Sequence, residues 1–189
     1  MNYQRFKLAV GENSGWDAVR RGLAEFDGWI IVNVSGDEND TGVLFLMETV
    51  QEFLDSGKDT LWLEGVNREE YYELLSEQID QFLDLGRELR QRLCLWRARQ
   101  MQLEIQDYLN RVQNFRHFIC CHDCQQEALL PAPVFKALFD AAEQLAVAAF
   151  AHEDNVRCMD HLEYELAPCL LELRKKIEQR QGLPKLGKN

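Results

Sequence analysis

Residues 67–119, NREEYYELLSEQIDQFLDLGRELRQRLCLWRARQMQLEIQDYLNRVQNFRHFI, decide the fold. Apolar side chains recur in this stretch at alternating steps of four and three residues, which places them along one face of an α-helix. They form two runs: Leu75, Ile79, Phe82, Leu89, Leu93 and Trp96, with Gly86 at the step between Phe82 and Leu89, and then Met101, Ile105, Tyr108, Val112, Phe115 and Ile119. The spacing slips at residues 97–100, where neither Pro nor Gly occurs. From an Asn67 cap, the pattern predicts either one long helix whose buried face changes at the slip or two helices that meet at a tight break. Because no Pro or Gly marks the slip, we favour one continuous helix.

Further helical segments follow this stretch. Residues 120–130 predict a turn, because prolines come directly after them. Residues 134–152 are alanine-rich and amphipathic, which predicts a helix. A last helix is expected from an Asn155 cap to about Arg180, with Pro168 kinking it or splitting it in two.

The first 65 residues have a different pattern. β-branched and aromatic runs predict strands over residues 3–10, 29–34 and 60–63, and residues 43–47 form a further apolar run. Short helices are expected from a Ser14 cap to Phe26 and over residues 48–54.

Together these segments predict an α+β fold that is predominantly helical. We expect a small acidic α/β head over residues 1–65, an antiparallel helical bundle over residues 66–181 and a frayed tail over residues 182–189. The long helix also offers a face through which a homo-oligomer could form.

The net charge of −11 is unevenly distributed. Residues 1–86 hold 18 acidic and 6 basic side chains, a balance of −12, whereas residues 87–189 hold 14 and 15, a balance of +1. An acidic surface of this kind repels nucleic acid and attracts a basic surface on a protein partner. Acidic side chains also keep a protein in solution, and that simpler explanation stays open.

Targeting and membrane signals are not evident in the sequence. No apolar run reaches the roughly 18 residues of a membrane span, and the first residues lack the basic and then apolar pattern of a secretory signal. We therefore expect a cytoplasmic protein with no membrane association, whose six cysteines are reduced thiols.

Cysteine and histidine residues form the one pattern with a clear chemical meaning. Cys121 and Cys124 make a CxxC motif, and Cys158 and His161 make a CxxH motif. Four thiolate and imidazole ligands are what a structural zinc site uses. If the last helix packs antiparallel to the end of the long one, these four side chains could converge on a zinc ion, and His117 could replace one of them.

Other interpretations of this cluster stay open. Cysteine is often buried as a small apolar residue, and the 33 residues between the two motifs exceed the spacing of common zinc modules. Redox use of the CxxC motif would need a thioredoxin-like context, which the neighbouring sequence does not suggest. In an open catalytic site, His117, His122 or Asp123 could act as acid or base.

Two weaker motifs have ordinary explanations. Asp37, Asn39, Thr41, Gly42 and Glu48 match positions of a calcium-binding loop. The preceding residues predict a strand instead of a helix, so a polar turn between strands explains the match.

A cluster of arginines surrounds Trp96: Arg87, Arg90, Arg92, Arg97 and Arg99. This combination can bind phosphates, but ion pairing within the protein is favoured in a chain this acidic.

These observations favour a non-enzymatic binding protein, such as an inhibitor, immunity-type or regulatory protein. Its acidic N-terminal half would engage a basic protein partner, and a zinc ion would stabilise the bundle. The alternative is a metal-dependent enzyme with its Cys and His site in the helical bundle. The sequence favours the first class and leaves the second open.

Overall fold

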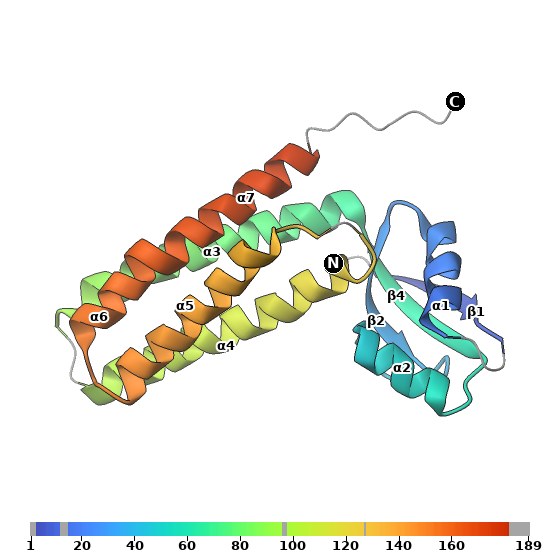
Figure 1. Cartoon of the computed structure of the whole chain (residues 1–189), viewed down its shortest axis with the longest axis horizontal. Coiled ribbons are helices and arrows are strands. Elements are labelled where there is room, and N and C mark those ends of the chain that lie inside the picture. The colour runs from blue at the N-terminus through green and yellow to red at the C-terminus, as the bar shows by residue number, and fades with distance from the viewer. Residues whose placement is uncertain (1–2, 12–14, 96–97, 127, 182–189) are drawn as a thin grey trace. The chain divides into compact units, whose positions relative to one another are not determined.

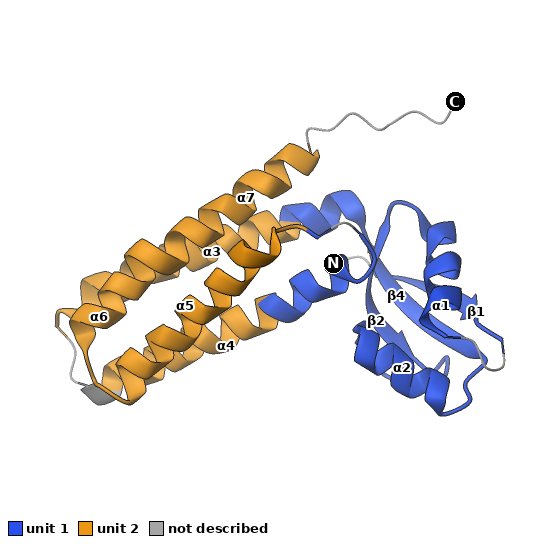
Figure 2. Ribbon diagram, in the orientation of Figure 1, with its two compact units in different colours: residues 1–73, 116–128 blue, residues 74–115, 129–189 orange. Residues whose placement is uncertain are grey.

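The computed structural model describes residues 3–11, 15–95, 98–126 and 128–181. The chain forms two compact units, shown in Figure 2. Residues 1–73 and 116–128 make up one, which we call the N-terminal unit, and residues 74–115 and 129–189 make up the other, which we call the helical unit. The fold is α+β and predominantly helical, as the sequence predicts.

The elements alternate early in the chain and are helical from residue 68 onward (Figure 1). The first part comprises β1 (Gln4–Ala9), α1 (Trp16–Leu23), a short 3-10 turn η1 (Ala24–Phe26), β2 (Trp29–Ser35), β3 (Val43–Leu44), α2 (Met47–Asp55) and β4 (Thr60–Asn67). The second part comprises α3 (Arg68–Leu93), α4 (Ala98–Asp123), α5 (Ala132–Phe150), α6 (Asn155–Asp160), a π-helical segment η2 (His161–Leu166) and α7 (Ala167–Gln181).

The sheet of the N-terminal unit is antiparallel, in the order β1-β4-β2-β3. One face carries polar side chains in a row across three strands, because Glu64 of β4 is paired with Arg5 of β1 and with Asn33 of β2. Arg5 lies 3.4 Å from the Glu64 carboxylate, and the Asn33 amide donates a hydrogen bond to it at 3.1 Å. This face is polar at these positions only, because Val66, two residues from Glu64 on the same face, and its partner Ile30 are fully buried. The opposite face of the sheet is a core face.

The core face packs against helices α1 and α2. Leu61 and Leu63 of β4 are fully buried there, with Val19 of α1 and Val50 of α2 in the same apolar cluster. The cluster also contains Cys121, which comes from the end of α4, far along the chain. Residues 116–128 thus complete the core of the N-terminal unit.

The apolar face predicted for residues 75–119 is buried, but the prediction of one continuous helix is wrong. The described members of both apolar runs lie in the core. The helix ends at Leu93, and a second one starts at Ala98; Trp96 and Arg97 lie outside the described residues. Reversal of the chain at this point lets the two apolar faces pack on each other, as the contact of Phe82 with Phe115 shows at 5.2 Å between ring centroids. A tertiary packing gain, and not a helix-breaking residue, therefore decides where the helix stops.

The last helix also differs from the prediction at its start. Asp154, not Asn155, is the N-cap, and its carboxylate accepts hydrogen bonds from the backbone N–H groups of Val156 and Arg157. The Asn155 side chain instead donates to the carbonyl of Leu93 at 2.6 Å, which satisfies a free carbonyl at the end of α3.

Pro168 is accommodated by a change in helix type. The expected disturbance takes the form of the π-helical segment His161–Leu166 directly before it, in which the N–H of Ala167 bonds to the carbonyl of Leu162, five residues back. The wider turn relieves the clash that a proline ring makes with the preceding turn of an α-helix.

Several predictions concern the remaining segments. The strand predicted over residues 60–63 extends to Asn67, whose side chain accepts a hydrogen bond from the N–H of Glu69, as a cap of α3 does. The Ser14 cap and the tail over residues 182–189 lie outside the described residues. Among the described helices, none has both the length and the apolar character that crossing a membrane requires.

Candidate functional site

Cys121, a predicted zinc ligand, is packed inside the N-terminal unit. Its side chain is fully buried, and its thiol lies 3.7 Å from the carbonyl of Val32 in a weak hydrogen bond. Burial, together with the neighbouring thiols of Cys124 and Cys120, raises the pKa of Cys121 to about 12. The metal-free protein therefore keeps this thiol protonated at neutral pH.

Cys124 lies beside the N-terminus of α2. Burial raises the pKa of its thiol above the usual value, and a hydrogen bond from the Met47 backbone opposes the rise. A helix N-terminus favours a thiolate, but desolvation is the larger effect here. The CxxC pair is thus held between α2 and the end of α4, with neither thiol activated.

Cys158 and His161 belong to the helical unit. Cys158 is buried in α6, and burial raises the pKa of its thiol to about 11. His161 Nδ1 lies 3.0 Å from the Glu165 carboxylate without forming a hydrogen bond to it. His117, the substitute ligand, is half-buried on the part of α4 that belongs to the N-terminal unit.

The predicted zinc ligands are therefore divided between the two units. No group of three or more His, Cys, Asp or Glu side chains among the described residues is arranged to hold a metal ion. The zinc site, in either its structural or its catalytic version, stays a prediction.

The thiols should differ widely in reactivity in the native, metal-free chain. We expect iodoacetamide at pH 8 to label the exposed Cys94 readily and Cys121 very slowly. The rise of the Cys121 pKa to about 12 from its ordinary value of 9.0 leaves about a thousandfold less thiolate. Pulse labelling followed by peptide mass spectrometry measures both rates. Equal labelling of the two thiols would contradict the buried position of Cys121.

His122 forms the centre of a buried polar network. Its side chain is fully buried, its Nε2 lies 3.1 Å from the Tyr72 hydroxyl, and its Nδ1 lies 3.0 Å from an Asp123 oxygen. Because a carboxylate only accepts hydrogen bonds, Nδ1–H donates to Asp123, and in the neutral ring Nε2 then accepts from Tyr72. The ring also stacks on Tyr71 at 5.9 Å between centroids. Both ring nitrogens are thus bonded within the protein, which fixes the end of α4 against the first turns of α3.

Gln125 continues this attachment on the neighbouring strand. Its side-chain amide accepts from the N–H of Ile31 at 2.8 Å and donates to the carbonyl of the same residue at 2.7 Å. The amide therefore takes the place of a neighbouring strand along β2, beyond the point where β3 ends. The end of α4 and the residues after it are therefore held in the N-terminal unit by the thiol of Cys121, the imidazole of His122 and the amide of Gln125. These contacts have a structural role.

Acidic residues are concentrated in the N-terminal unit. Its segments contain 17 acidic and 7 basic residues, whereas those of the helical unit contain 15 and 14. Asp37 is paired with Lys58 at 2.9 Å, and Asp27 with Arg68 at 3.1 Å. Several exposed acids of this unit form no ion pair with the part of the chain that the structure describes, and Glu38, Asp40, Glu48 and Glu52 are among them.

The segment predicted to resemble a calcium loop contributes much of this surface. It follows strand β2, not a helix, and Phe45, at one of the ligand positions, is fully buried in the core. The segment is a turn that leads into β3 and α2, in agreement with the ordinary explanation.

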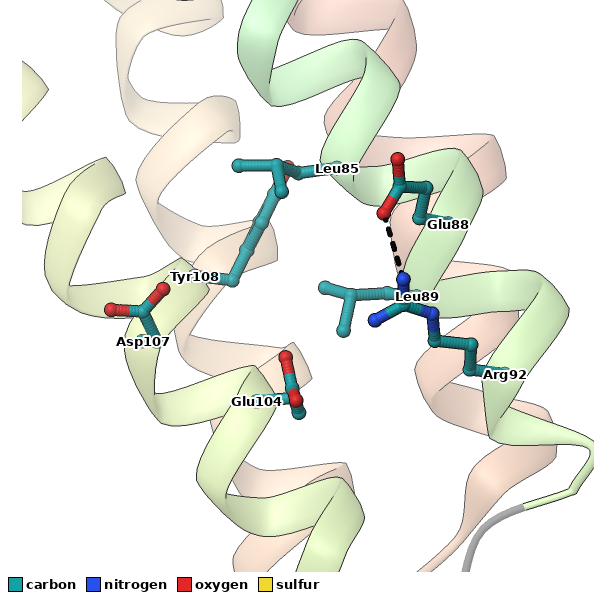
Figure 3. Close-up of a pocket in the computed structure, with 7 residues that line it drawn as sticks. All are labelled: Leu85, Glu88, Leu89, Arg92, Glu104, Asp107 and Tyr108. Carbon is teal, nitrogen blue, oxygen red and sulfur yellow. Dashed lines mark hydrogen bonds and ion pairs between the residues drawn. The ribbon is translucent and has the colours of Figure 1, made fainter.

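A small hollow lies between α3 and α4 in the helical unit (Figure 3). Its lining residues are Leu85, Glu88, Leu89, Arg92, Glu104, Asp107 and Tyr108. Its water-accessible volume of about 30 Å³ suits one or two water molecules. A pocket for a small organic ligand is about ten times larger, so this hollow gives no support to a substrate site.

Three of the five arginines predicted to pair within the protein do so; Arg97 and the side chain of Arg99 lie outside what the structure describes. Arg87 lies 2.7 Å from Asp84, Arg90 lies 2.5 Å from Glu163, and Arg92 lies 3.2 Å from Glu88. All three partners belong to the helical unit. These arginines therefore have carboxylate partners in their own unit.

Comparison of the chain with models of protein families, with curated proteins and with solved structures gave no match. Inference about its function therefore rests on the residues and contacts described above.

Proposed function

We propose that the chain is a non-enzymatic binding protein whose acidic N-terminal unit engages a basic surface on a protein partner. The observation that carries the proposal is the concentration of negative charge in one compact unit. The N-terminal unit has a balance of −10 and the helical unit one of −1.

This distribution favours binding over solubility as the role of the charge. Acidic residues that only keep a protein in solution need no segregation, and they can lie on every exposed face. A single-sign surface on one unit instead steers a partner of opposite charge toward that unit and gives the encounter a strong dependence on salt. The phosphates of a nucleic acid would be repelled.

The unpaired acids are available for such a partner. Glu38, Asp40, Glu48 and Glu52 are exposed and lie on or near the segment between β2 and α2. The zinc site predicted from Cys121, Cys124, Cys158 and His161 is a separate proposal, since none of these acids belongs to it.

Neutralising these acids should weaken partner binding about tenfold. The variant carries Glu38→Gln, Asp40→Asn, Glu48→Gln and Glu52→Gln, each of which removes about 0.2–1 kcal/mol of attraction. The measurement is an affinity capture from the native host, quantified by mass spectrometry at about 0.05 M and about 0.5 M salt. The unchanged chain should retain basic proteins at low salt. The variant should not retain them, and the unchanged chain should release them at high salt.

A matched variant of the helical unit provides the control. Glu77→Gln, Glu143→Gln, Asp160→Asn and Glu172→Gln remove the same number of exposed charges of the same kinds. This control should retain the same partners as the unchanged chain. If both variants lose the partners to the same extent, or if neither variant loses them, the N-terminal unit is not the acidic binding surface.

A further inference from the structure

The segment from Glu38 to Glu48, which we call the edge segment, presents apolar side chains to solvent. Val43, Leu44 and Met47 are 47%, 37% and 51% exposed. The segment is nevertheless firmly attached: Phe45 is fully buried, with its ring 5.9 Å from that of Trp16. Its backbone N–H also donates to the carbonyl of Val32 at 2.8 Å. An anchored segment with outward apolar side chains is a preformed surface and not a frayed loop.

The same segment contains an open strand edge. β3 is the last strand in the order β1-β4-β2-β3, and it pairs with β2 alone. Since the N–H of Phe45 faces β2, and N–H groups alternate along a strand, the N–H of Leu44 faces the open edge, whereas the Leu44 carbonyl already accepts from the N–H of Leu46 at 3.0 Å. An edge of this kind can accept a further strand through main-chain hydrogen bonds.

The charges around this edge indicate the chemistry of the added strand. Glu38 and Asp40 precede β3, Glu48 follows it, and all three are exposed. One cation lies beside them: the Arg5 guanidinium donates to the backbone carbonyls of Glu38 and Asp40. A second copy of this chain, with its net charge of −11, would bring acid against acid. The opposite edge strand, β1, carries the exposed basic residue Lys7, which discourages pairing with a basic strand.

We propose that the edge segment binds a basic, extended segment of a protein partner by strand addition to β3, an inference that rests on the proposed function. Alternate side chains of an added strand point to opposite sides. Because Val43 and Leu44 are adjacent and lie on opposite faces of β3, one set would contact Leu44 through apolar groups, and the aliphatic stems of the other set would contact Val43. The other set would place lysine or arginine beside Glu38, Asp40 and Glu48.

Peptide binding to the full chain tests this inference. The probe is a short peptide of alternating lysine and valine, and its control is the same peptide with N-methyl groups on alternate backbone nitrogens. Calorimetry should show that the unmethylated peptide binds at least tenfold more tightly, because methylation removes main-chain donors and leaves charge and side chains unchanged. A glutamate and valine peptide should not bind.

Variants of the chain separate the two proposals. Val43→Ser with Leu44→Ser should weaken binding of the lysine and valine peptide several-fold, and the four neutralised acids should weaken it about tenfold. If methylation has no effect while the neutralised acids still reduce binding, strand addition is wrong and the acidic surface remains. If neutralising the acids has no effect, the proposed function fails as well. Failure of the unmethylated peptide to bind overturns the strand-addition inference.

Discussion

The Phe45→Ala variant should lose about 3–5 kcal/mol of unfolding free energy. Phe45 is fully buried, and it is the residue through which the edge segment enters the core of the N-terminal unit. Truncating the ring removes its apolar contacts, including that with Trp16, and leaves a cavity among Val19, Val50 and Leu61. Because the free energy of unfolding of domains of this size is about 5–15 kcal/mol, this change should remove a large part of it.

Urea denaturation followed by circular dichroism measures this loss. Val43→Ala provides the control, since Val43 is two residues away and exposed, and its truncation should change stability by no more than about 0.5 kcal/mol. Similar losses in the two variants would contradict the anchored position of Phe45. Because the chain has two units, the denaturation curve is fitted for separate transitions if more than one appears.

The second large effect is expected at His122. Replacing it with Ala should lower the unfolding free energy by about 3–5 kcal/mol, because the change leaves a cavity beside Tyr71 and a buried Tyr72 hydroxyl without its acceptor. His117→Ala is the matched control on the same helix. His117 is only half-buried, so its removal should cost about 1 kcal/mol or less.

A double-mutant cycle isolates the hydrogen bond within this effect. Tyr72→Phe removes the hydroxyl that His122→Ala alone would leave without a hydrogen-bond partner. The combined loss in Tyr72→Phe with His122→Ala should therefore be smaller than the sum of the single losses by about 1 kcal/mol. Strictly additive losses would show that the two side chains do not interact.

The elements of the fold were predictable where local sequence is sufficient. Leu75, Ile79 and Phe82 repeat with helical spacing, and Ile30 and Ile31 sit in a β-branched run, so period and residue type indicate the element. The break between α3 and α4 was not predictable in this way. It depends on packing between Phe82 and Phe115, 33 positions apart, and no Gly or Pro marks it.

The contacts of the candidate site were less predictable. His122 and Asp123 were recognised as titratable groups beside the CxxC motif, but Tyr72 is 50 positions away in sequence. Gln125 is 94 positions from Ile31, and a glutamine that completes a strand edge has no local pattern. The acidic N-terminal half was evident from composition. The exposure of Val43 and Leu44 was not, because a short apolar run has the same sequence pattern whether it is buried or exposed.

Hydrogen–deuterium exchange of the full chain with the lysine and valine peptide tests the central claim most directly. The claim is that the acidic N-terminal unit binds a basic partner along the edge segment. We expect the peptide to slow amide exchange in residues 43–47, with the N–H of Leu44 included, and the four neutralised acids to abolish this protection. Protection confined to the helical unit, or no protection at a saturating peptide concentration, would contradict the claim.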